Sequence, residues 1–63
     1  MPEVVEKLAH RINEAARLTD LSRDTLERLI ARGEIKSWKI GSARLISDEE
    51  LRRFIREREQ AAN

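Results

Sequence analysis

The sequence contains 63 residues, enough for one small domain and too few for a sizeable enclosed catalytic pocket. It has no cysteine, which excludes disulfides and thiolate metal sites, and no apolar run approaches the roughly 20 residues of a membrane span. The 13 basic and 12 acidic residues leave a net charge of +1, so the overall charge does not indicate a nucleic-acid partner. Because no apolar signal core lies near its start, we expect a soluble, cytoplasmic protein.

The positive charge is nevertheless concentrated in the middle of the chain. Residues 1–22 carry three basic and four acidic groups, residues 23–45 carry six and three, and residues 46–63 carry four and five. The three segments therefore have net charges of −1, +3 and −1. A contact with phosphates is expected in the middle segment, although an excess of three charges is modest.

The first predicted element is a helix over about residues 3–18, in which apolar residues recur mostly at helical spacing. Pro2 suits the first turn of this helix. Asn13 can cap a separate second helix, so one continuous helix and two helices broken near residues 10–13 both remain open. Thr19 and Asp20 then form a tight turn.

The next predicted helix begins at Ser22, a good N-cap, and ends at Gly33, which suits the left-handed residue after a helix. Asp24 lies in its first turn, where a negative charge is favourable. The stripe predicted to be buried consists of Leu26, Leu29 and Ile30. At about ten residues, this helix is too short to be stable without tertiary packing.

A hairpin is predicted to follow, with Gly41 and Ser42 at its turn. Along its first strand, Lys39 faces the side opposite Trp38 and Ile40. Because a two-stranded ribbon is only marginally stable alone, one of its faces must lie on the helices. We therefore expect Trp38 in the core rather than stacked on a nucleotide.

The last predicted helix begins with a capping box over residues 47–50, which accounts for the acidic side chains there. Its apolar face ends near residue 56, so residues 57–63 are expected to be a frayed tail. The single domain, residues 1–63, then has its core at about residues 11–56. The order helix, tight turn, helix, hairpin, helix predicts a mainly α fold with a small β-hairpin, a winged helix-turn-helix.

Candidate DNA contacts lie first on the second helix. Arginine can donate two hydrogen bonds to a guanine edge, and acidic side chains can accept one from cytosine. The predicted contacts are Arg23, Asp24, Thr25, Glu27 and Arg28, with the two arginines as the principal ones. The alternative is a solvated helix face in which Arg23 and Glu27 form an ion pair at i,i+4.

The hairpin supplies the remaining candidates. Lys39, Ser42 and Arg44 can bind a phosphate or enter a narrow minor groove. The alternative is a solubilising ribbon, in which the lysine blocks edge-to-edge aggregation.

No residue pattern indicates catalysis or a cofactor. His10 is the single histidine, has no partner at ligand spacing and is expected at the surface or at a helix end. The sequence contains neither a nucleophile–base pattern nor a glycine-rich phosphate loop. We expect no enzyme activity, no cofactor and no bound metal.

Parts of the chain resemble the helix-turn-helix of the MerR-like excisionase DNA-binding domains. The similar runs are residues 13–18, 21–23, 25–26, 29–35 and 39–41, and the likeness covers about residues 11–56. Asp20 stands where glycine is frequent in the family, but aspartate tolerates the left-handed conformation. Ser42 and Ala43 stand where basic residues are frequent, which weakens the expected contact of the hairpin with phosphate.

The resemblance implies a phage excisionase of the mycobacteriophage type, a recombination directionality factor acting in a bacterial host cell. Such a protein binds adjacent sites on double-stranded DNA cooperatively, side by side with further copies of itself. It bends the DNA and biases a phage integrase toward excision. Two alternatives remain: a minimal MerR-like transcription regulator, and a protein-interaction module whose charged helices dock a partner.

Overall fold

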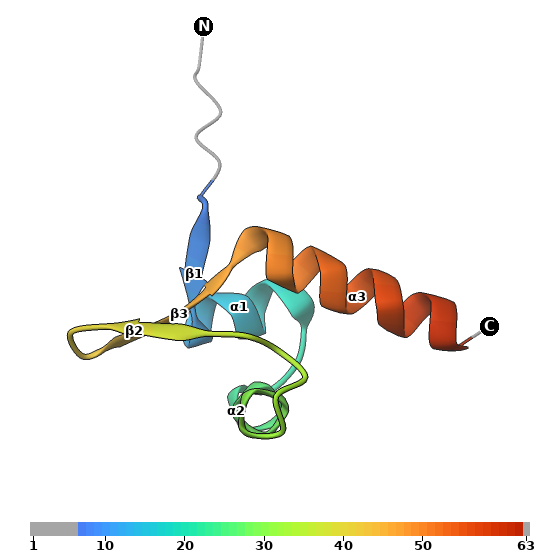
Figure 1. The fold of residues 1–63 in the computed structure, drawn as a ribbon, viewed down its shortest axis with the longest axis horizontal. Coiled ribbons are helices and arrows are strands. Elements are labelled where there is room, and N and C mark those ends of the chain that lie inside the picture. Colours follow the sequence, from blue (N-terminus) through green and yellow to red (C-terminus); the bar gives the residue numbers. More distant parts are fainter. Residues whose placement is uncertain (1–6, 63) are drawn as a thin grey trace, which may run out of the picture.

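A computed structural model of the protein describes residues 7–62. In these residues the chain forms three helices and a three-stranded antiparallel sheet (Figure 1). The elements in chain order are β1 (Ala9–Arg11), α1 (Ile12–Thr19), α2 (Arg23–Ala31), β2 (Trp38–Ile40), β3 (Ala43–Ser47) and α3 (Asp48–Ala62). This arrangement confirms the predicted winged helix-turn-helix.

Strand β1 replaces part of the helix predicted over residues 3–18. Ala9–Arg11 pair with β3, and the helix begins only at Ile12, with Arg11 rather than Asn13 as its N-cap residue. The chain is therefore not one continuous helix through residues 10–13, and the element before α1 is a strand rather than a first helix. Three residues are too few for a periodicity to distinguish strand from helix, and pairing with a distant strand decides the outcome. The part of this prediction that falls on residues 1–6 lies outside the described residues.

The turn between α1 and α2 forms as the sequence predicts. Asp20 adopts the left-handed conformation, with φ of 59°. Ser22 is the N-cap of α2, and its Oγ accepts a hydrogen bond from the backbone N–H of Thr25 at 3.1 Å. Gly33 lies just beyond α2 with φ of 78°, where a side chain would strain the backbone. Asp20 and Ser22 thus form the turn from α1 into α2, and Gly33 ends α2.

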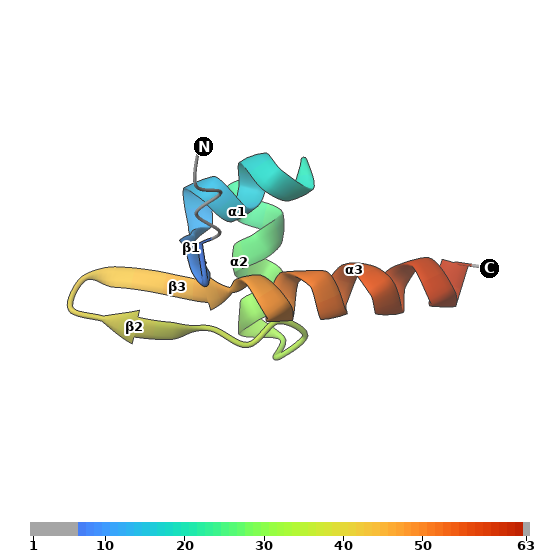
Figure 2. The same cartoon turned by 90° about the horizontal axis from the view of Figure 1, so that it is seen from above.

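The sheet has the order β1-β3-β2, and its two faces differ in character. His10 pairs with Ile46 and both are buried, so their face of the sheet lies on the helices. Trp38 pairs with Leu45 on the opposite face, and its side chain is 41% exposed. The prediction that Trp38 lies in the core is therefore wrong. The hairpin extends beyond the helices (Figures 1 and 2), so no helix of residues 7–62 packs on its outer face.

Helix α3 begins at the predicted cap but ends later than predicted. The Oγ of Ser47 accepts a hydrogen bond from the backbone N–H of Glu50 at 3.0 Å. The helix continues to Ala62, so the expected frayed tail is helical through that residue. Ion pairs stabilise the extension: Arg53 pairs with Glu57 on the same helix, and Arg58 pairs with Glu34. Such pairs let a helix persist after its apolar face has ended.

The core is a single cluster of buried side chains from β3 and all three helices, together with Ile35 before β2. It consists of Ile12, Ala15, Leu26, Leu29, Ile35, Ile46, Leu51 and Phe54. His10 is also buried, which corrects the expected surface position, and its Nε2 is hydrogen-bonded to Oδ1 of Asp48 at 2.8 Å. The backbone N–H of Asp48 donates to the carbonyl of Leu8 at 2.9 Å. Together these bonds attach β1 to the start of α3.

Candidate nucleic-acid interface

Helix α2 is held to the domain by one face and presents the other to solvent. Leu26 and Leu29 are buried, and Leu26 is completely inaccessible. Among the predicted contacts, Arg23, Asp24, Glu27 and Arg28 are exposed. Thr25 is only half-buried, and its hydroxyl is hydrogen-bonded to that of Ser22 at 2.8 Å, so it belongs to the helix cap. The exposed face therefore consists mainly of charged side chains.

Arg23 is fixed in place by two neighbours. Its Nε donates to Oε1 of Glu27 at 3.0 Å, which is the predicted i,i+4 pair. Its Nη1 donates to Oδ1 of Asn13, on α1, also at 3.0 Å. Arginine has five N–H donors, so three of those of Arg23 remain for another acceptor. The guanidinium thus links the first turns of α1 and α2 while keeping hydrogen-bonding capacity.

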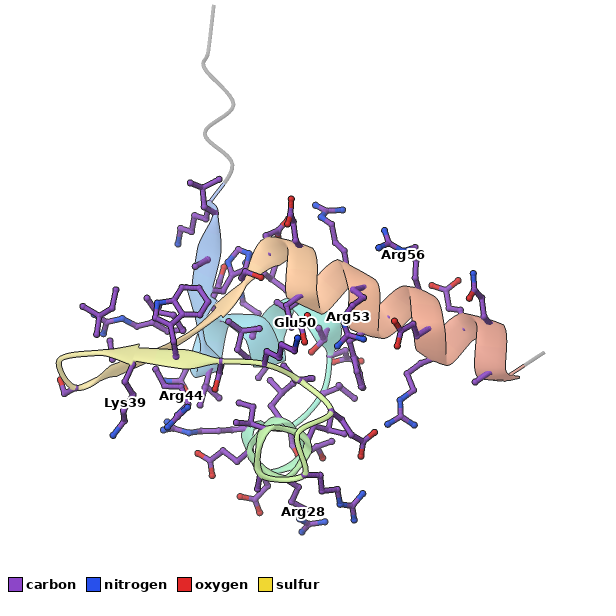
Figure 3. The ribbon with its side chains drawn as sticks, in the orientation of Figure 1. Arg28, Lys39, Arg44, Glu50, Arg53 and Arg56 are labelled. Atoms are coloured by element: carbon purple, nitrogen blue, oxygen red, sulfur yellow. The ribbon has the colours of Figure 1, made fainter. Side chains whose placement is uncertain are left out.

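Arg28 is different, because its side chain takes part in no ion pair or side-chain hydrogen bond with residues 7–62. It projects away from the domain below α2 (Figure 3). A free, exposed guanidinium on a helix can reach a base edge or a phosphate without first breaking another contact.

The hairpin directs two cations toward α2. Lys39 and Arg44 are directly opposite each other on β2 and β3, and both project to the α2 side of the ribbon (Figure 3). Nη1 of Arg44 donates to Oγ of Ser37 at 2.6 Å, which orients the guanidinium. Ser42 is exposed at the turn beside Gly41, whose φ is 60°.

A groove of about 620 Å³ lies between α2 and the hairpin. It brings together five of the predicted contacts, which are Arg23, Glu27, Lys39, Ser42 and Arg44. Asp24, Thr25 and Arg28 do not line it. The charged residues that line it are four cations and one carboxylate, because Arg11 is also among them. The groove therefore has an excess of three positive charges.

Two residues that line the groove, Arg11 and Asn13, are not among the contacts predicted from the sequence. Both residues lie within the helix predicted over about residues 3–18 or at its possible break near residues 10–13, and neither alternative gives a reason to direct them toward the hairpin. In the structure Arg11 ends β1 opposite Leu45, and Asn13 lies in the first turn of α1. A basic residue directly before the first helix of a helix-turn-helix is the signal that could have drawn attention to Arg11.

The position of the hairpin is fixed on its other side by α3. Glu50 accepts two hydrogen bonds from Arg53, at 2.8 and 2.7 Å, and one from the backbone N–H of Lys36 at 2.8 Å. The hydrogen bonds from Arg53 are the main reason that the pKa of Glu50 is lowered to about 2. Arg53 also donates to the carbonyl of Glu34 at 3.1 Å. We call these four residues the α3 clasp (Glu50 and Arg53 are labelled in Figure 3).

The clasp holds residues 34 and 36, which connect α2 to the hairpin, against α3. It therefore restrains the connection from α2 to the hairpin.

Other kinds of site find no support in the described part of the chain. Within residues 7–62, no group of three or more histidine and acidic side chains can hold a metal ion. No helix in the same range has the length and apolar character needed to cross a membrane.

Comparison with known proteins agrees with this geometry. A family model described as a helix-turn-helix domain matches residues 11–59, which is most of the chain. No curated protein and no solved structure matches the chain. Helix-turn-helix domains bind DNA through their second helix, which corresponds here to α2. The chain belongs to the helix-turn-helix domain family.

Proposed function

We propose that the protein is a sequence-specific architectural DNA-binding protein that carries out no covalent chemistry. The exposed face of α2 enters the major groove, and the hairpin contacts the adjacent backbone. One observation supports this most strongly: the groove between α2 and the hairpin combines four cations with a single carboxylate, beside a charged helix face. That arrangement suits double-stranded DNA, which offers negatively charged phosphates to the cations and base edges to the helix face, better than it suits a small molecule.

The dimensions of α2 are compatible with this role. An α-helix with its side chains is about 10–12 Å in diameter, and the major groove of B-DNA is about 12 Å wide, so a helix such as α2 can enter it. Arg28 is free to donate to a guanine edge, and Asp24, in the first turn, can accept from cytosine. Glu27 is already engaged by Arg23, so its role is to orient that arginine.

Within DNA-binding proteins, we propose a phage excisionase that binds adjacent sites cooperatively, bends the DNA and biases an integrase toward excision. The resemblance over about residues 11–56 supports this. A domain with so few cations at its interface contacts few phosphates, so a single copy binds weakly and with strong salt dependence. Occupancy then requires several copies side by side. The resulting bend costs about 1–6 kcal/mol over a site of 20–30 base pairs.

A protein-interaction module is the second candidate, because the outer face of the hairpin exposes apolar side chains. Trp38 is 41% exposed and Ile40 is 63% exposed. Exposed apolar surface of this kind often marks a contact with another protein.

Selection from a pool of randomised duplexes distinguishes these functions. We expect enrichment of one sequence, with affinity falling steeply between about 50 and 200 mM salt. The Arg23→Ala and Arg28→Ala double variant is expected to lose this enrichment. Binding that is absent or indifferent to sequence favours the interaction module.

An excision assay with an integrase encoded near the gene then tests the finer proposal. We expect the protein to increase excision from a reporter that carries the attachment sites. Sequence-specific binding without any effect on excision would instead favour a minimal transcription regulator.

A further inference from the structure

We propose that the groove between α2 and the hairpin binds a single phosphate of the DNA backbone, held by Arg11 and Arg23. Arg28, which lies outside the groove, then determines which base is read. This inference rests on the proposed DNA-binding function and divides the interface into two parts. It also assigns a binding role to Arg11, which belongs to neither the recognition helix nor the hairpin.

The residues of α2 that line the groove lie on one side of the helix. Arg23, Glu27, Ile30 and Ala31 line the groove, and they recur at intervals of four, three and one residues. This spacing marks one stripe of a helix. Arg28 follows Glu27 directly, so it lies about 100° away around the helix axis. Two arginines of the same short helix therefore face different parts of a bound duplex.

The side chain of Arg23 is held in one position by two hydrogen bonds. Its hydrogen bonds to Glu27 and Asn13 hold the guanidinium at the wall of the groove, against the first turn of α1. To reach a base edge in front of α2, Arg23 would have to break both contacts. A phosphate that enters the groove can use its remaining N–H donors without disturbing either one. Asn13 therefore acts as a positioning residue for Arg23.

The residues that line the groove have a net positive charge. Arg11 is exposed, and its side chain has no ion-pair or side-chain hydrogen-bond partner in the part of the chain that the structure describes. It shares the groove with Arg23, Lys39 and Arg44, while the carboxylate of Glu27 is already bound to Arg23. An uncharged base edge would leave this excess of positive charge uncompensated. A phosphate relieves the repulsion among the cations, so the groove selects an anion.

The test compares Arg11→Ala and Arg23→Ala with Arg56→Ala. Arg56 is an exposed cation on α3 that projects away from α2, so its removal changes the net charge equally without touching the groove (Figure 3). Affinity for a short duplex of mixed sequence is measured at several salt concentrations, and base preference by selection from a randomised pool. Circular dichroism confirms that each variant is folded.

We expect Arg11→Ala and Arg23→Ala to weaken duplex binding about tenfold near 0.1 M salt and to lower the salt slope by about one. Their preferred sequence should match that of the wild type. Arg56→Ala should leave both quantities close to wild type. Arg28→Ala should change the preferred base at one position instead.

A second measurement uses the preferred sequence once selection has identified it. Single phosphates are replaced by uncharged methylphosphonates, one position at a time. One replacement should weaken the wild type about tenfold and leave Arg11→Ala unaffected, because the variant has already lost that contact.

Three results would overturn the proposal. If Arg11→Ala behaves like Arg56→Ala while the wild type still binds its preferred sequence, the groove does not hold a phosphate, and the DNA-binding function stands. If Arg23→Ala changes the preferred bases, Arg23 reads sequence. If the wild type ignores duplexes but binds a polyglutamate peptide through Arg11, the groove receives an acidic protein and the proposed function fails as well.

Discussion

Within residues 7–62, three of the four arginines of α3 are tied to carboxylates, whereas the cations around the groove, apart from Arg23, are not. Arg53 contacts Glu50 and Glu57, and Arg58 contacts Glu34. Four cations line the groove, and the single carboxylate there, that of Glu27, pairs with Arg23 alone. The chain as a whole has almost equal numbers of basic and acidic residues, with a net charge of +1. Pairing, rather than composition, determines which cations are available to a ligand.

The difference arises from where the acidic residues lie. Those of α3 lie in its first turn or one turn away from an arginine, where they stabilise the helix and pair with its side chains. The hairpin, by contrast, contains no acidic residue between Ile35 and Ser47. Arginine therefore stabilises the fold on one side, and on the other side it is left available for the proposed binding of DNA. Four predictions test that division, in order of decreasing effect.

The largest effect is expected from the Lys39→Ala and Arg44→Ala double variant. Removing both hairpin cations should weaken duplex binding about 10- to 100-fold near 0.1 M salt, because each lost phosphate contact also reduces counterion release. The matched control is Arg17→Ala with Arg56→Ala, which removes two positive charges elsewhere. Fluorescence anisotropy with a labelled duplex measures both. Equal losses in the two double variants would mean that overall charge, and not the groove, governs binding.

The next effect concerns the α3 clasp. Glu50→Gln keeps the size of the side chain but removes the charge that binds Arg53. We expect the free energy of unfolding to fall by about 1–2 kcal/mol, since the pair is only partly shielded from water. Chemical denaturation measures this. Glu49→Gln, one residue earlier and exposed, should leave stability unchanged. An equal loss in both variants would show that the charge of the helix start matters rather than the clasp.

The same ion pair predicts a dependence on pH. The pKa of Glu50 is lowered from 4.5 to about 2, so its contribution is fully present above about pH 4.5 and is lost as pH falls toward 2. Stability curves of wild type and Glu50→Gln should therefore converge in acid. Glu14 and Asp48, whose pKa values are also lowered, remain in both proteins and cancel in the difference. A constant gap from pH 7 to pH 2 would contradict the assignment.

The smallest effect is expected from Arg58→Ala. The guanidinium lies 5.0 Å from the centre of the Phe54 ring and pairs with Glu34. Its loss should lower the free energy of unfolding by about 0.5 kcal/mol and leave duplex affinity unchanged, because this cation is on the paired side. Thermal unfolding and anisotropy measure the two quantities. A loss of affinity without a loss of stability would place Arg58 among the DNA contacts.

Local signals in the sequence predict much of the fold. The caps at Ser22 and Ser47, the left-handed residues at Asp20 and Gly33, and the turn at Gly41 all involve neighbours within four residues, and all are confirmed. They are readable because their hydrogen bonds and backbone angles depend on residue type at fixed offsets.

What local patterns do not predict depends on distant parts of the chain. His10 is buried because β1 pairs with β3 and Asp48 accepts its hydrogen bond, 38 residues away. Trp38 is exposed because the helices cover the other face of the sheet. Alternation along the strand assigns Trp38 to one face but does not reveal which face the helices cover. Arg11 joins the candidate site only because β1 places it beside the hairpin. Most of the candidate contacts were predicted, but their division into groove and outer face was not.

Within residues 7–62 the side chain of Arg28 has no ion-pair or side-chain hydrogen-bond partner, and this has an evolutionary consequence. Its neighbours on the buried side of α2, Leu26 and Leu29, hold the helix in the core without help from position 28. Replacing Arg28 therefore alters the surface offered to DNA while the fold keeps its contacts. If Arg28 reads a base as proposed, a lineage can change its target sequence at this position in single steps, with little cost in stability to be compensated elsewhere.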